Sequence, residues 1–97
     1  SGVRLTTYST TANSHPNNHD EYDSFETTYA IDSNKFGSGI VNVIDTTGGN
    51  NNPYHDGTDD KYLSIFEGYV YIPSDGEYSF AVNGDDAVEV MIDDEPV

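Results

Sequence analysis

The chain has 97 residues, with 3 Lys and Arg against 18 Asp and Glu, so its formal net charge is −15 at pH 7. This length fits one small domain over 1–97, which buries only roughly two-thirds of its unfolded surface. The charge excludes a duplex nucleic-acid binder, which needs Lys and Arg to neutralise phosphates, and opposes attraction to an anionic membrane. Cysteine is absent, which excludes disulfides and Cys-based metal or nucleophile chemistry. No apolar run approaches the ~20 residues of a membrane helix. Bound cations would relieve the self-repulsion of such a chain.

The composition predicts a folded, all-β domain rather than an acidic disordered segment. Eight Tyr and four Phe, with 34% hydrophobic residues, are too many for disorder despite the charge. Tyr, Thr, Val and Ile favour pleated sheets, whereas the strong helix formers Leu and Ala are scarce. Gly, Asn, Asp and Ser interrupt every apolar segment, as turns between short strands do.

The first 60 residues predict strands separated by two long loops. Residues 2–8 alternate apolar and polar positions, as a half-buried strand does, and 39–44 are β-branched between glycines. Residues 9–24 and 45–60 are polar and aperiodic, which predicts surface loops, and loops of this length are commonly functional. Residues 25–31 fit either a short strand or a loop whose aromatic side chains cap the core. A lone helix in one of the loops stays open, although no segment shows clear 3.6-residue amphipathicity.

The last third predicts consecutive antiparallel strands joined by tight turns. Each apolar run alternates and ends at Gly, Pro, Asn or Asp, whose backbone preferences suit turns. Strands are expected at 62–66, 69–72, 77–82 and 87–92, with turns at 73–76, 83–86 and 93–95. In these strands Tyr78, Phe80 and Val82 are expected to face inward, and Val88, Val90 and Ile92 share one face. Such a succession builds an antiparallel β-sandwich or barrel.

The stretch GYVYIPSDGEYSF at 68–80, followed by NGDDAVEVMID at 83–93, resembles the PA14 domain family. The resemblance covers most of 62–97 and is weak over 3–8. It implies a β-sandwich or barrel module of the kind found in secreted toxins, glycosidases, flocculins and adhesins. A second ligand loop of that family would fall beyond Val97, so the resemblance also implies a fold that is incomplete here or completed by strands of a partner chain.

The resemblance further implies a calcium site at Asp85 and Asp86. In sugar-binding members of the family, paired aspartates joined by a cis peptide chelate Ca²⁺, which in turn holds sugar hydroxyls. Two adjacent carboxylates repel each other, and Ca²⁺, which takes six to eight oxygen ligands, offsets that repulsion. Asn83 is a further candidate ligand through its amide oxygen. The alternative is that 83–86 is an ordinary β-turn made of residues that tolerate one.

The other polar clusters are weaker candidates. Residues 56–67 imitate the acid spacing of an EF-hand loop, but Lys61 occupies the glycine position and a strand follows, which favours a solvated acidic turn. The histidines, His15, His19 and His55, all fall in predicted loops. His15 and His19 have the i, i+4 spacing of a helical metal site, but Pro16 between them opposes a regular helix, which favours plain surface histidines.

Aromatic loop residues could contact a sugar ring. Tyr22, Tyr29 and Tyr54 either stack on a ligand or cover a small core, and the second role is commoner. For catalysis, no carboxylate pair at a defined separation and no Ser-His arrangement stands out, so the chain is expected not to be an enzyme.

These features predict an extracellular or cell-surface, calcium-dependent carbohydrate-binding or adhesion module that binds glycans or polysaccharides, with no nucleic-acid binding and no membrane insertion. The alternative is a structural or interaction subunit of a pilus, filament or adhesin. Unpaired strand edges at 69–72 or 87–92 would then accept a partner chain.

Overall fold

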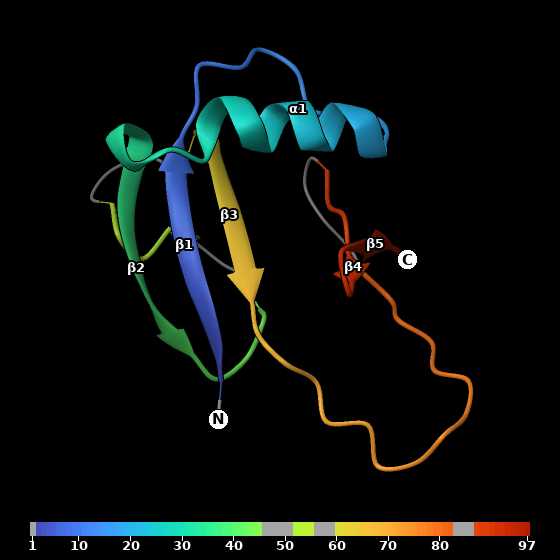
Figure 1. Cartoon of the computed structure of the whole chain (residues 1–97). Coiled ribbons are helices and arrows are strands. Elements are labelled where there is room, and N and C mark those ends of the chain that lie inside the picture. Colours follow the sequence, from blue (N-terminus) through green and yellow to red (C-terminus); the bar gives the residue numbers. More distant parts are fainter. Residues whose placement is uncertain (1, 46–51, 56–59, 83–86) are drawn as a thin grey trace.

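Antiparallel strands dominate the fold, as the composition predicts, and the all-β class is confirmed with one short helix added (Figure 1). The computed structural model describes residues 2–45, 52–55, 60–82 and 87–97. The elements in chain order are β1 (Val3–Ser9), α1 (His19–Tyr29), a 3₁₀ turn η1 (Asp32–Asn34), β2 (Lys35–Val41), β3 (Tyr62–Glu67), β4 (Met91–Ile92) and β5 (Glu95–Pro96).

β1 is the central strand of a three-stranded sheet with the order β2-β1-β3. It pairs antiparallel with β2 from Val3↔Val41 onward and with β3 from Arg4↔Glu67 onward. The strands expected at 2–8 and 62–66 are therefore confirmed to within a residue at each end. The strand expected at 39–44 is shifted toward the N-terminus, as β2: pairing with β1 recruits residues 35–38, and residues 42–44 lie outside the strand.

The centre of β1 is covered on both faces, although its alternation predicted a half-buried strand. Leu5 is 2% exposed, and the neighbouring Thr6 and Thr7 are buried as well. The Thr7 hydroxyl donates a 2.8 Å hydrogen bond to Asn52 Oδ1, and the same oxygen accepts the Tyr54 backbone N–H at 3.2 Å. The described core thus consists of one leucine beside a cluster of hydrogen-bonded polar groups. These groups can be buried at little cost in stability because each has a hydrogen-bond partner.

The Tyr54 side chain packs over two glycines of β2. A Cβ placed on Gly37 would lie 2.8 Å from Tyr54 Cβ, and one placed on Gly39 would lie 2.6 Å from the Tyr54 hydroxyl oxygen. Gly39 and Gly37 stand opposite Leu5 and Thr7 in the β1–β2 register. Because these two glycines have no side chains, they leave room for an aromatic ring from a segment outside the sheet. Of the two roles considered for Tyr54, stacking on a ligand or covering a small core, the structure shows the second.

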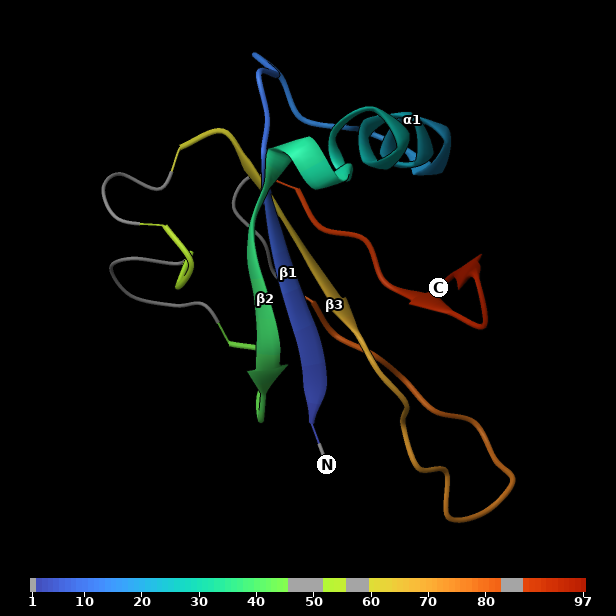
Figure 2. The same ribbon diagram turned by 60° about the vertical axis from the view of Figure 1, so that its left-hand side comes forward.

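The helix α1 corrects the expectation of a strand or loop at 25–31 and shortens the expected loop 9–24. It lies across one end of the sheet (Figures 1 and 2), and none of its residues is fully buried. Tyr22, Phe25 and Tyr29 are half-buried at spacings of three and four residues, so the helix buries one shallow face. The Phe25 and Tyr29 rings meet at a centroid distance of 4.8 Å.

Residues 68–82 are extended but pair with no strand in the described part of the chain, which corrects the strands expected at 69–72 and 77–82. Tyr69, Val70, Tyr71 and Ile72 are exposed, and the segment swings away from the sheet before returning (Figures 1 and 2). The turn at 73–76 forms a bend, and the Tyr78 hydroxyl donates to the Ser74 carbonyl at 2.6 Å. Alternation makes a segment suitable for a sheet, but a strand also needs a neighbouring backbone, which these residues do not meet among the described ones.

The strand expected at 87–92 is reduced to β4, which forms a two-stranded ribbon with β5. Asp93 and Asp94 connect them with φ of 51° and 64°, the backbone of a type I′ hairpin turn. The Val97 N–H donates to the Val90 carbonyl at 2.9 Å and extends the pairing by one rung. The turn expected at 93–95 is confirmed.

The buried polar cluster predicts a cost for Thr7→Val. The variant keeps the side-chain shape but removes the hydroxyl that donates to Asn52 Oδ1. The free energy of unfolding should therefore fall by about 1 kcal/mol. This is near the lower limit for a buried group that loses its partner, because Asn52 Oδ1 still accepts the Tyr54 N–H. Urea unfolding measures it, and Thr7→Ser, which keeps the hydroxyl, is the matched control. A Thr7→Val protein as stable as the wild type would show that the cluster does not stabilise the fold.

The two glycines under Tyr54 predict unequal effects of a single methyl group. Gly37→Ala meets the rigid Cβ of Tyr54 and should destabilise by about 1–3 kcal/mol through overpacking. Gly39→Ala meets only the far end of the ring, which turns aside more easily, so its cost should be smaller. Equal effects in thermal unfolding would contradict this packing.

Candidate functional site

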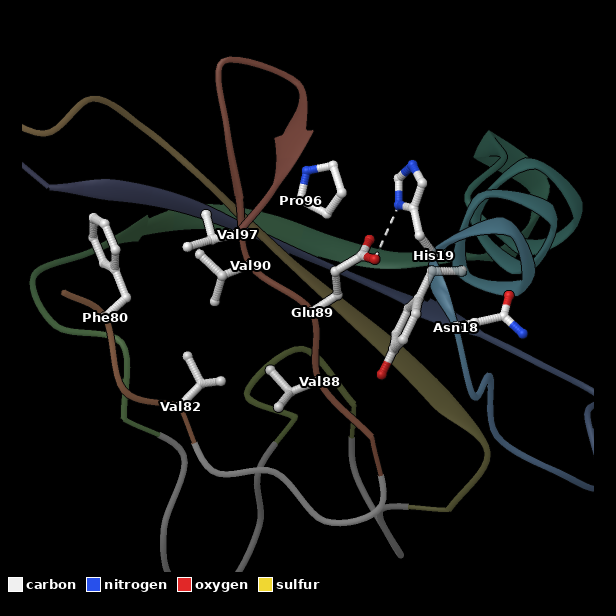
Figure 3. Close-up of a pocket in the computed structure, with 10 residues that line it drawn as sticks. Asn18, His19, Phe80, Val82, Val88, Glu89, Val90, Pro96 and Val97 are labelled. Atoms are coloured by element: carbon white, nitrogen blue, oxygen red, sulfur yellow. Dashed lines mark hydrogen bonds and ion pairs between the residues drawn. The ribbon is translucent and has the colours of Figure 1, made fainter. Parts of the chain in front are cut away.

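A cleft of about 200 Å³ lies between the start of α1 and the C-terminal segment. Its apolar lining comes from the two segments where strands were expected, 77–82 and 87–92, and from the C-terminal end; these residues are Phe80, Val82, Val88, Val90, Pro96 and Val97. Asn18, His19 and Glu89 bring polar groups to the opposite side (Figure 3). Phe80 and Val82, expected to face a core, instead line this cleft and are about half exposed.

The N-terminal cap of α1 fixes the position of His19. Asn18 Oδ1 accepts the Glu21 backbone N–H at 3.0 Å, and Glu21 reaches back to the Asn17 N–H at 3.0 Å and to Asn18 Nδ2 at 3.2 Å. This reciprocal arrangement is a variant of the capping box with asparagine as the cap, in which Glu21 bonds the backbone N–H one residue before the cap. His19 is therefore the first residue of a capped helix, which directs its ring toward the C-terminal segment.

The His19 ring lies between two carboxylates. Nδ1 is 3.0 Å from Glu89 Oε2 on the C-terminal segment, and Nε2 is 3.3 Å from Asp23 Oδ2 one turn along the helix. The hydrogen bond to Glu89 raises the pKa of His19 above its ordinary value of 6.5 and is the largest effect. Desolvation is the next largest and lowers the pKa, while the charges of Asp23, Glu89 and Asp20 each raise it. The histidine is thus biased toward its cationic form, with an N–H for each carboxylate.

Tyr22 lines the same cleft as a neutral group. Desolvation raises the pKa of its phenol, and the nearby Glu89 carboxylate raises it further. A protonated phenol on the wall of a cleft offers one hydrogen-bond donor beside an apolar ring face, which is the amphipathic surface that sugars and peptides contact.

The predicted calcium ligands Asp85 and Asp86, with Asn83, lie outside the described residues. The cleft-lining residues Val88 and Glu89 follow Asp86 by two and three positions in the sequence. Among the residues that are described, no group of three or more His, Asp or Glu is placed to hold a metal ion. In the acidic segment that has EF-hand-like spacing, Asp60 and Lys61 are described, and they lead directly into β3, as a turn before a strand does.

The remaining candidates are dispersed. His15 Nδ1 lies 3.0 Å from the Pro16 carbonyl outside the helix, and the His55 ring packs on Phe36 at a centroid distance of 4.4 Å. The helical metal site at His15 and His19 is not formed, since α1 begins only at His19. Tyr29 lines a second, shallower cleft of about 350 Å³ between α1 and residues 12–16. The structure does not bring Tyr22, Tyr29 and Tyr54 to one site, because Tyr54 covers β2.

The pairing of His19 with Glu89 has no signal in the local sequence, because the two residues are 70 positions apart. The helix that presents His19, in contrast, did have a signal in the local sequence. An asparagine followed three residues later by glutamate marks a helix start, and Tyr22, Phe25 and Tyr29 follow at helical spacing.

These features define a small antiparallel β domain with an open cleft of mixed apolar and charged character. The family model of the PA14 domain matches residues 18–97, and the chain belongs to this family. The family is associated with carbohydrate binding and adhesion, is typically a binding rather than a catalytic module, and occurs commonly in extracellular or cell-surface proteins. Comparison with curated proteins gives no match, and comparison with solved structures gives none. In the described part of the chain, no helix is both long and apolar enough to span a membrane.

The capping box predicts that Asn18→Ala destabilises the protein by about 0.5–2 kcal/mol, because the Glu21 N–H loses its acceptor at the helix start. Asn17→Ala is the matched control, since residue 17 contributes its backbone N–H to the box. Thermal unfolding followed by circular dichroism compares the two. Equal Tm values for the two variants would rule out the asparagine side chain as the cap.

Proposed function

We propose that this chain is a calcium-dependent carbohydrate-binding module of an extracellular or cell-surface adhesin. The observation that carries the proposal is the family match over 18–97, which includes the Asp85-Asp86 pair in a sequence context typical of the family. The net charge of −15 supports a bound cation, since a divalent ion between two carboxylates lowers the repulsion where it is greatest.

In this proposal Asp85 and Asp86 hold Ca²⁺ and the ion binds vicinal sugar hydroxyls. Asn83 adds an amide oxygen to the ion or to the sugar. The cleft beside α1 then supplies the side chains that distinguish one sugar from another, with the Tyr22 phenol and the apolar wall as its contact surfaces. Sugars suit such a mixture because they have both hydroxyl groups and apolar C–H faces.

A second candidate function is that of a structural or interaction subunit of a surface assembly. It is favoured by the exposed apolar side chains of 69–72, which lie in an extended segment without a paired strand among the described residues. Extended apolar backbone of this kind accepts a strand from another chain.

Calcium titration tests the first proposal. A ligand that binds only the native state raises stability by mass action, by about 2.7 kcal/mol at a hundredfold excess over Kd, so calcium should raise the Tm of the wild type. Asp85→Ala should abolish this rise, whereas Asp75→Ala, which removes an exposed aspartate from another glycine-containing turn, should retain it. A glycan array with and without chelator then shows whether the ion serves sugar binding.

No calcium effect on Tm in the wild type would contradict calcium binding, and an array without signal would contradict the carbohydrate proposal. Native mass spectrometry of the same samples distinguishes the second candidate function, which requires a protein complex in place of, or in addition to, a bound ion.

A further inference from the structure

His19 connects the start of α1 with the C-terminal segment. α1 has no fully buried residue, and among the described residues its side chains are joined to residues 87–97 by a single hydrogen-bonded ion pair, that of His19 with Glu89 (Figure 3). The Glu89 side chain is 16% exposed and that of His19 is 36% exposed, so the contact is partly shielded from solvent at the mouth of the cleft. Its state therefore affects how closely the C-terminal segment approaches the helix.

Only the protonated ring satisfies both of its neighbours. With both nitrogens protonated, Nδ1–H donates to Glu89 and Nε2–H donates to Asp23, whereas a neutral imidazole has a single N–H and leaves one carboxylate without a donor. Loss of the proton also converts an attraction between opposite charges into a site with two unneutralised carboxylates.

From this geometry we infer that His19 is a pH-dependent latch that holds residues 87–90 against the start of α1 and opens the cleft when it loses its proton. The groups that face His19 are Asp20 and Asp23 from its own helix and Glu89 from the C-terminal segment, and all three favour the cation. The latch acts on residues 87–90, which follow Asp85-Asp86 in the sequence and form one side of the cleft. It would therefore control access to the cleft. It does not require the proposed function to be correct.

The direction of the pH effect follows from linkage. The folded-state pKa of His19 is raised, so its stabilising contribution is complete below the unfolded value of 6.5 and is lost as the pH rises through the folded value. Histidine is the side chain whose ordinary pKa places its change of charge near neutral pH.

The experiment uses calcium-free protein without sugar, so failure of the lectin proposal does not affect it. Tm is measured between about pH 6 and about pH 8 for the wild type, for His19→Gln and for the control His15→Gln. We expect the wild type and His15→Gln to lose stability as the pH rises, and His19→Gln to lose at least half of that dependence. His19→Lys, which keeps a positive charge throughout this pH range, should also lose at least half of that dependence.

Nuclear magnetic resonance reports the latch directly. The Val88 and Val90 methyl signals should shift with the same midpoint as the His19 ring, and Glu89→Gln should lower that midpoint and reduce the methyl shifts. The inference is overturned if His19→Gln keeps the full pH dependence of the wild type, or if the methyl signals do not follow the histidine. It is also overturned if Glu89→Gln leaves the midpoint unchanged.

Discussion

β1 is hydrogen-bonded to a strand on each of its edges, and the described fold depends on this double pairing. The pairing places Leu5, Thr6 and Thr7 at the best-buried point of the chain. Glycines in β2 then admit Tyr54, so a segment outside the sheet completes the covering of its face. The core is small and partly polar, and its stability depends on hydrogen bonds being satisfied as much as on apolar area.

Electrostatics is the second constraint. With only 3 Lys and Arg in the chain, cations are too few to pair with the carboxylates. Arg4 donates to Ser38 and Lys61 donates to Asn13, so both bind neutral oxygens. Both ion pairs found among the described residues involve His19 instead. A bound cation would lower the repulsion within a domain built this way.

The cleft beside α1 joins these two constraints. Most of its apolar wall comes from alternating positions of two expected strands, and its polar side carries the histidine between two carboxylates. Membership of the PA14 family makes carbohydrate binding the function to test first. Val88 and Glu89, which line the cleft, follow Asp85-Asp86 closely in the sequence.

The sequence by itself determined the all-β class, the family, the strands 62–67 and 3–9 nearly to the residue, and the turn at Asp93-Asp94, because alternation and turn chemistry are local properties. Only the tertiary structure decided that 69–72 and 77–82 pair with no strand among the described residues, since a ladder needs a second backbone that no local pattern specifies. The helix α1 had its capping signal in Asn18 and Glu21, but Thr, Asp and aromatic residues have modest helix propensity and concealed it. The contact between His19 and Glu89 was beyond any local reading, because it depends on where the chain returns after 70 residues.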